Sequence, residues 1–549
     1  MRPRLFALSL LVLAATSARA QTASFPIMDS GGPIDHERAS YDVRFYDLAL
    51  EVFPDARHIA GRLAVRARIT SPTDVLVLDL DTVFSVSEAT LAGQPVRLGR
   101  QGGRLRLPFG RTAQPGETVE ATVRYEGAPR VARRAPWDGG FVWQTTPSGA
   151  PWIATAVQGD GCDLYWPCKD HPTDEPDSMA ISVTVPAPLV VATNGRLRGV
   201  DEAGGKRTYR WFVHNPINSY NVALNIAPYR TVETTFTSVT GETVPAVFYV
   251  IPERYDDAVR IFPQFLDHVR WYERTVGPFP WRRDKYGVAH TPHLGMEHQS
   301  INAYGSDFGG GPDGFDWLHH HELAHEWWGN VQTAWDWRDY WLHEGTGTYM
   351  QSLYAEETRG MDGYFANIAR NRRSITNRLP VAPRRFMTTD SLYNGDVYYK
   401  GALTLHTLRF LIGKEALLTA LRRQVYPTPE MERAHGGSQT HFTTTDDFVA
   451  LVNRIAGRDL AWFFEVYLRQ AALPRLVSEP AGTELRLRWE VPGNLPFLMP
   501  VEVSIDGRTQ RVEMPNGQAT VRLPRAGATV IVDPQGWVLK EEPRRDARQ

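Results

Sequence analysis

The chain has 549 residues, with 60 basic and 62 acidic side chains, a formal net charge of −2 at pH 7 and two cysteines. This length predicts more than one domain. The near balance of charge argues against nucleic acid or an anionic membrane as a partner, and two cysteines are too few for a disulfide scaffold.

The first twenty residues have the pattern of a secretory signal peptide. A basic start is followed by residues 5–15, which are apolar apart from Ser9, and Ala18-Arg19-Ala20 is a small-residue cleavage site. The apolar run is too short to span a bilayer, so we expect no membrane anchor. Cleavage near Ala20 would move the net charge from −2 to −5 and release an exported protein, periplasmic or secreted.

Residues 21–229 are expected to form an N-terminal antiparallel β domain. Short alternating runs, such as residues 63–69 and 181–185, are broken by Gly, Pro and Asp. Cys162 and Cys168 are separated by five residues in this part, and export would permit a disulfide between them. Two free, buried thiols are the alternative.

Residues 230–472 show helical periodicity, for example over residues 261–275 and 402–411, and contain the motif His321-Glu322-Leu323-Ala324-His325. Four residues advance a helix by about 400° and roughly 6 Å, so both imidazoles face one ion. The motif therefore predicts a zinc site with Glu322 as the general base. A solvated histidine run is the competing reading, because the chain has 16 histidines.

A third zinc ligand is predicted at Glu344, which follows His325 after 18 intervening residues, where a second helix opens. Two histidines and one glutamate leave the fourth position of a single zinc ion for water. The arrangement of a metzincin is excluded, because Trp328 and Val331 stand where its glycine and third histidine would be.

Residues 473–549 return to strand-like alternation, as in residues 485–489 and 501–505. We expect a small C-terminal β domain here. The whole chain is then multidomain α+β, without internal repeats, low-complexity tracts or heptad runs.

The zinc motif, the 18-residue spacer and the Glu-Gly that follows resemble the gluzincin zinc aminopeptidases, the family of aminopeptidase N and leukotriene hydrolase. Leu294-Gly295-Met296-Glu297-His298 is similar to the family's Gly-x-Met-Glu-Asn segment. The resemblance implies that Glu297 binds the free amine of a peptide substrate, with Gly295 and Met296 beside it.

Two further segments match the family. Tyr398-Tyr399-Lys400-Gly401 resembles its Tyr-x-Lys-Gly motif, which implies that Tyr398, not Tyr399, donates a hydrogen bond to the oxyanion. Gln158, followed by eight residues and then Pro167-Cys168, is in register with a second anchor for the amine.

The family resemblance extends over nearly the whole mature chain. It implies an N-terminal β domain, a thermolysin-like, mainly helical catalytic domain and a small C-terminal β domain, with no large C-terminal helical domain. Many family members carry that helical domain over the active site, so the cleft is expected to be more open here.

Four departures from the family bear on the site: Leu294 replaces a glycine, His298 and His343 each replace an asparagine, and Gln158 is neutral where many members carry a carboxylate. Leu294 and His298 are expected to alter the backbone geometry around the substrate's first peptide bond. Because the neutral Gln158 leaves Glu297 as the single formal charge facing the amine, we expect weaker amine binding. Asp339 and Asn330 are candidates for orienting the zinc histidines, with a helix cap or a solvated acid as the alternative.

The resemblance implies a zinc aminopeptidase acting on peptides. A zinc endopeptidase would share the metal residues but would not need Glu297 and Gln158, and a binding protein would need neither base nor oxyanion donor. Epoxide hydrolysis is known in one branch of the family, but no residue here marks that activity. The arginine that some relatives use to hold a substrate carboxylate cannot be placed in this sequence. The preferred N-terminal residue and the oligomeric state are not set by the sequence.

Overall fold

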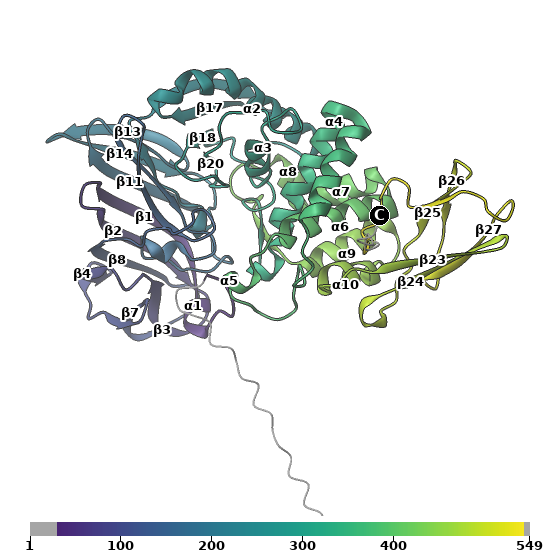
Figure 1. Cartoon of the computed structure of the whole chain (residues 1–549). Helices are drawn as coiled ribbons and strands as arrows, with labels where there is room; N and C mark the ends of the chain where they lie inside the picture. Colours follow the sequence, from purple (N-terminus) through teal and green to yellow (C-terminus); the bar gives the residue numbers. More distant parts are fainter. Residues whose placement is uncertain (1–29, 543–549) are drawn as a thin grey trace, which may run out of the picture.

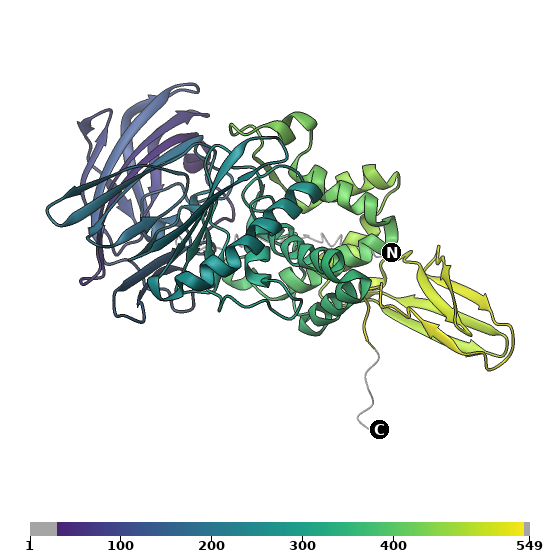
Figure 2. The ribbon, with the colours of Figure 1, turned by 90° about the horizontal axis from the view of Figure 1, so that it is seen from above.

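The computed structural model describes residues 30–542, so the predicted signal peptide lies outside the described residues. Three parts follow one another along the molecule: β-sheets, a helical region and a second β region that projects from the far side of the helices (Figures 1 and 2). Between residues 30 and 542, no helix combines the length and the apolar character that a membrane span requires.

The first part is built on an eight-stranded sheet in which apolar side chains alternate into the core. Its pairs are antiparallel except for β1 with β11, which run parallel. In spatial order the strands are β13 (Arg196–Ala203), β14 (Lys206–Val213), β11 (Ser178–Pro186), β1 (Tyr41–Phe53), β2 (His58–Ile69), β8 (Thr118–Gly127), β4 (Ser85–Leu91) and β5 (Gln94–Pro95).

Two smaller sheets and a short helix complete this part. The short helix α1 spans His36–Ala39, and one sheet orders β3 (Thr73–Asp79), β7 (Arg104–Ala113) and β6 (Gly99–Gln101). The other orders β12 (Val190–Ala192), β15 (Asn225–Ala227), β10 (Pro151–Ala156) and β9 (Gly140–Thr145).

The loop after β10 is closed by a disulfide between Cys162 and Cys168, which is the first of the two predicted alternatives. Both cysteines are fully buried, and the backbone of Cys168 pairs with Asp79 at the end of β3. Gln158 lies between the end of β10 at Ala156 and this disulfide-closed segment, so the strand on one side and the bridged loop on the other fix its position.

The second part begins with a mixed five-stranded sheet. Its strands lie in the order β16 (Arg230–Thr237), β17 (Thr243–Val250), β18 (Tyr286–His290), β20 (Asn302–Tyr304) and β19 (Gly295–Met296). The edge strand β19 pairs antiparallel with β20 and ends immediately before Glu297, so the sheet edge sets the position of that carboxylate.

Helices form the rest of the second part (Figure 1). A two-stranded parallel ladder joins β21 (Gln332–Ala334) to β22 (His441–Thr443). The helices are α2 (Tyr255–Thr275), α3 (Trp317–Ala324), α4 (Trp341–Ser374), α5 (Thr389–Leu392), α6 (Asp396–Ile412), α7 (Lys414–Val425), α8 (Pro429–Arg433), α9 (Thr445–Ala456) and α10 (Ala461–Arg469).

Helices α4 and α6 pack closely through a pair of glycines. A Cβ atom at Gly345 would lie 2.9 Å from the Cα atom of Gly401 and 3.0 Å from the carbonyl oxygen of Val397. Only glycine at both positions permits this approach. The contact brings the first turn of α4, which carries Glu344, against the first turns of α6, which carry Tyr398.

The third part consists of two three-stranded sheets, and between residues 470 and 542 the only helical element is a 3-10 turn at Pro492–Asn494. One sheet orders β23 (Arg475–Ala481), β24 (Glu484–Glu490) and β27 (Gln518–Arg522), and the other orders β26 (Arg508–Val512), β25 (Val501–Ile505) and β28 (Val530–Val532). The predicted fold class, with β, helical and small β parts and no large helical domain after α10 in the described chain, is confirmed.

Candidate active site

The two histidines of the motif converge as the sequence predicts, although α3 ends between them. Asp316 caps the helix by accepting a hydrogen bond from the backbone N–H of His319, and His325 is the C-terminal cap residue with φ −70° and ψ −14°. Because this conformation is still helical, the spacing is preserved. The Nε2 atoms of His321 and His325 lie 3.3 Å apart.

Glu344 completes the metal cluster from the first turn of α4. Its Oε2 atom lies 3.0 Å from Nε2 of His321 and 3.5 Å from Nε2 of His325. A tetrahedral zinc ion with bonds of about 2.0–2.1 Å separates its ligands by about 3.4 Å, so these residues fit zinc. The Nδ1 atom of His325 lies 2.9 Å from the carbonyl oxygen of Trp328, which fixes the proton on Nδ1 and turns the Nε2 lone pair inward.

The charges of the cluster favour a cation at its centre. Burial alone would lower the pKa of His325, but the carboxylates of Glu344 and Glu297 outweigh it and raise the pKa to about 10. Burial alone would raise the pKa of Glu344, and the neighbouring His325 and His321 instead hold it below its ordinary value. Buried carboxylates that stay ionised beside imidazoles are the electrostatic setting of a metal site.

Glu322 is buried beside the cluster and lines the same cavity. Its carboxylate rests against the edge strand β19, where a Cβ atom on Gly295 would lie 2.4 Å from its Oε1 atom. Burial, with the nearby Glu297 carboxylate, raises the pKa of Glu322 well above its ordinary value. A carboxylate with a raised pKa is a stronger proton acceptor once ionised, as a general base requires.

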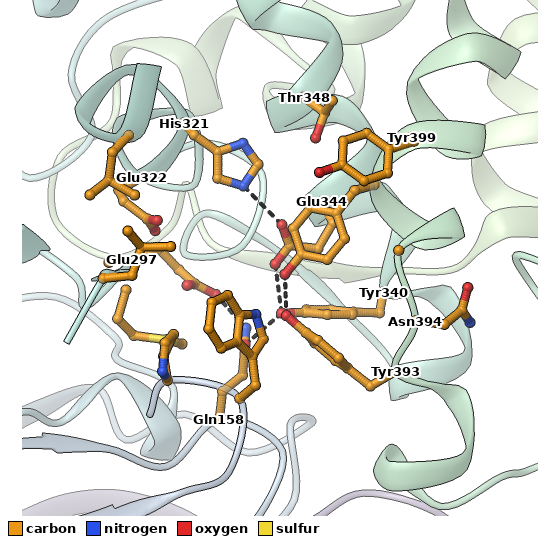
Figure 3. A pocket seen from close by; sticks show the side chains of 18 of the residues that line it. Gln158, Glu297, His321, Glu322, Tyr340, Glu344, Thr348, Tyr393, Asn394 and Tyr399 are labelled. Atoms are coloured by element: carbon orange, nitrogen blue, oxygen red, sulfur yellow. Dashed lines mark hydrogen bonds and ion pairs between the residues drawn. The ribbon is translucent and has the colours of Figure 1, made fainter. Parts of the chain in front are cut away.

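Glu297 and Gln158 meet across the cavity (Figure 3). The Nε2 atom of Gln158 donates a hydrogen bond to Oε1 of Glu297, and the hydroxyl of Tyr220 donates to the same oxygen over 3.2 Å. Burial, with a smaller contribution from Glu344, raises the pKa of Glu297 to about 7 against the opposing effect of His325. The two predicted amine anchors are therefore adjacent, and they come from different parts of the fold.

Tyr398 lies next to the metal cluster. Its ring stacks on that of His321, with centroids 5.8 Å apart and planes at 25°, and its hydroxyl is hydrogen-bonded to the hydroxyl of Tyr393. Tyr399 also lines the cavity but stacks on neither metal histidine. This geometry suits Tyr398 for the oxyanion role.

Three tyrosines of the site were missed from the sequence. The hydroxyl of Tyr340 contacts Oε1 of Gln158 and lies 2.6 Å from Oε1 of Glu344. Tyr340 precedes Glu344 by four residues, which is one helical turn, so this spacing was a usable signal. Tyr393 lies five residues before Tyr398 of the Tyr-x-Lys-Gly motif, so the motif was a usable signal for it. Tyr220 belongs to the N-terminal part and lies near none of the sequence motifs.

The two residues considered for orienting the zinc histidines contact other partners. The side-chain amide of Asn330 donates to the carbonyl oxygen of Glu297 and to Glu326. Asp339 accepts hydrogen bonds from the backbone N–H and the hydroxyl of Thr445 at the start of α9, close to the predicted capping alternative. The ring of His325 is oriented by the backbone carbonyl of Trp328. Every residue has such a carbonyl, so the sequence does not indicate this partner.

Two of the departures from the family pattern, His343 and His298, are fully buried histidines. His343 accepts a hydrogen bond from the backbone N–H of Ala334, over 2.9 Å, at its Nε2 atom. His298 is fully buried, and burial lowers its pKa to about 3, so it is neutral. Neither histidine competes for the metal.

A cavity of about 700 Å³ opens in front of the cluster. It is large enough for several peptide residues, and its walls combine large apolar and aromatic side chains with charged ones such as Arg134, Asp160 and Arg370. Besides the predicted site residues, Trp137, Trp317, Trp337, Tyr340, Leu392 and Tyr393 line it.

The chain is similar in sequence to known peptidases. Residues 318–467 match the peptidase family M1 domain. Leucine aminopeptidase 2 of Aspergillus fumigatus is 26% identical over 58% of this chain and 50% of its own length. Aminopeptidase N of Escherichia coli is 24% identical over 72% of this chain and 48% of its own length. The chain thus spans about half the length of these curated relatives.

Solved structures match over a larger share. The M1 zinc metallopeptidase of Deinococcus radiodurans is 25% identical, with a TM-score of 0.66 over 81% of this chain and 97% of that one. A variant of that protein with a Tyr-Ser-Ala substrate bound superimposes with a TM-score of 0.65 at 25% identity, over 81% and 98%.

The fold and the His-His-Glu cluster are similar to those of the M1 zinc metallopeptidases, which are of the gluzincin type. The M1 domain match over residues 318–467, with the aminopeptidase relatives and the M1 metallopeptidase structures, supports the gluzincin, aminopeptidase N type that the motifs resemble.

Proposed function

We propose that this protein is an aminopeptidase, with one zinc ion per chain, that removes the N-terminal residue of peptides. The observation that carries the proposal is the closeness of anchor and hydrolytic centre. One ligand atom each from Glu297, Glu322 and His325 lie within 4.8 Å of one another. A substrate ammonium held at Glu297 leaves space for one residue before the bond that is cut.

The residues of the site divide the reaction among them. His321, His325 and Glu344 would hold the zinc ion, which would supply an electrophile and lower the pKa of water when bound. Glu322 accepts the proton of the attacking water and passes it to the leaving amine. The hydroxyl of Tyr398 donates a hydrogen bond to the oxyanion as charge develops there.

The substrate's ammonium group is held by Glu297 and Gln158. Oε1 of Glu297 already accepts hydrogen bonds from Gln158 and Tyr220, which leaves Oε2 for the substrate. The relatives named leucine aminopeptidase and aminopeptidase N, and the tripeptide bound by a structural neighbour, support the same substrate class.

The proposal is tested by replacing the general base. Glu322→Gln keeps the shape of the side chain, and we expect turnover of an aminoacyl reporter to fall by about 10²–10⁴-fold while zinc stays bound, because loss of a general base costs that much. Glu415→Gln, an exposed glutamate on α7, is the matched control and retains wild-type rates. An active, zinc-loaded Glu322→Gln enzyme contradicts the assignment.

We also propose that the protein is exported. The basic start, apolar run and small-residue site of residues 1–20 support this, and the bond between Cys162 and Cys168 is compatible with an oxidising compartment. Expression of the full chain followed by N-terminal sequencing tests it. A mature protein that begins near Gln21 is expected, and an uncleaved cytosolic protein refutes it.

A further inference from the structure

Tyr340 stands between the metal ligand and the amine anchor, and the function proposed above gives it no role. It is the residue immediately before α4, it is 3% exposed, and its side chain points into the cavity (Figure 3). Its ring is held by edge contacts with Trp337 at 5.5 Å and His343 at 5.6 Å. The direction of the phenol is therefore set by packing.

The hydroxyl of Tyr340 joins two groups that come from separate parts of the fold. It lies 2.6 Å from Oε1 of Glu344, the oxygen that does not face the histidines, and it contacts Oε1 of Gln158. Gln158 belongs to the loop after β10, and its Nε2 atom bonds to Glu297. A continuous line of hydrogen bonds thus runs from the metal ligand to the amine anchor.

These hydrogen bonds fix the orientation of the Gln158 side chain. The single proton of the Tyr340 hydroxyl faces two acceptor oxygens, Oε1 of Glu344 and Oε1 of Gln158, and is shared between them as a three-centre hydrogen bond. The amide of Gln158 is gripped at both ends, by Tyr340 at one and by Glu297 at the other. Without the phenolic oxygen, one end of the amide loses its partner and the side chain is free to rotate away from the substrate.

We propose that Tyr340 is a positioning residue that sets Gln158 relative to the metal, and so makes Gln158 an effective second contact for the substrate's ammonium. The inference rests on the proposed aminopeptidase function and deepens it. It assigns to Tyr340 a part of the selection for peptides with a free N-terminus. Tyr340 hydrogen-bonds to the metal ligand Glu344 but to neither Glu322 nor Tyr398, so it does not contact the groups proposed to move the proton and to stabilise the oxyanion.

Tyr340→Phe tests the proposal, because it keeps the packed ring and removes only the hydroxyl. For an aminoacyl reporter we expect KM to rise roughly tenfold, the effect of one hydrogen bond near a charged group, with kcat within about threefold of wild type. Zinc content stays at the wild-type level. Tyr349→Phe is the matched control, since that buried hydroxyl on α4 interacts with Tyr364 and Arg409 rather than with Gln158 or Glu344, and it leaves KM unchanged.

The double variant separates positioning from a merely structural role. Gln158→Ala should raise KM as much as Tyr340→Phe, and the two together should raise it no further, because both remove the same contact. A KM unchanged in Tyr340→Phe, an additive double variant, or loss of zinc from Tyr340→Phe would each overturn the proposal. Failure of the proposed function is seen separately, as a wild-type enzyme that does not cleave the reporter at all.

Discussion

The contact between α4 and α6 is a point where a single methyl group should inactivate the enzyme without unfolding it. Gly345 and Gly401 let the two helices approach so closely that an added Cβ atom at 345 would lie 2.9 Å from a backbone carbon. Comfortable carbon separations are about 3.5–4.0 Å, so Gly345→Ala must push the helices apart by roughly 0.6–1.1 Å.

The two consequences of that movement differ in size. Overpacking costs about 1–3 kcal/mol, and the better helix propensity of alanine returns about 1 kcal/mol, so the free energy of unfolding should fall by at most about 2 kcal/mol. Glu344 and Tyr398 lie on opposite sides of the contact, and a displacement of about 1 Å between reacting groups costs about 10²-fold in rate. Activity should therefore suffer far more than stability.

The assay is kcat/KM for an aminoacyl reporter, measured with zinc content and urea unfolding on the same preparation. We expect a loss of about 10²-fold at near-wild-type stability. Gly199→Ala is the control, because its Cβ atom in β13 meets nothing within 4 Å, and it should behave as wild type. Full activity in Gly345→Ala would refute the claim that this contact sets the geometry of the site.

Three other outcomes are expected. Tyr398→Phe should lower kcat by about 10²–10³-fold with zinc retained, as for loss of an oxyanion donor, and an unchanged kcat would remove it from the mechanism. Glu326→Ala should cost about 3–5 kcal/mol in urea unfolding, because this buried carboxylate accepts hydrogen bonds from four residues, and a loss below about 1 kcal/mol would contradict that. Burial lowers the pKa of His406 to about 3, so below its unfolded value of about 6.5 only the unfolded chain takes up the proton and stability falls as pH falls, by up to about 1.4 kcal/mol per unit. Burial lowers the pKa of His298 in the same way, so His406→Gln should reduce that slope between about pH 6.5 and pH 3 without removing it, and an unchanged slope would show that His406 does not contribute to it.

The metal cluster was predictable because helical spacing dictates it. His321 and His325 must face the same way on any helix, and Glu344 opens a second helix whose first turn is pressed against α6. The order of β, helical and β parts also follows from local alternation and periodicity. These features depend on residues close together in the sequence.

The rest of the site depends on contacts between distant residues. Gln158 and Glu297 are 139 positions apart, and Gln158 and Tyr340 are 182 apart, so no spacing rule joins them. The resemblance to a family supplied Gln158 and Glu297 but not Tyr220 or Tyr340, whose hydroxyls are part of this network. The hydrogen-bond partner of His325 could not be predicted for another reason: it is a backbone carbonyl, which does not depend on residue type.

Glu297 and Gln158 should restrict cleavage to peptides with a free amine. The most direct measurement compares kcat/KM for an aminoacyl reporter and for its N-acetylated form with the zinc-loaded enzyme. Acetylation removes the charge that the anchors bind and adds bulk where they lie, so cleavage of the acetylated form should fall below detection. Equal rates for the two substrates would contradict the account and identify an endopeptidase.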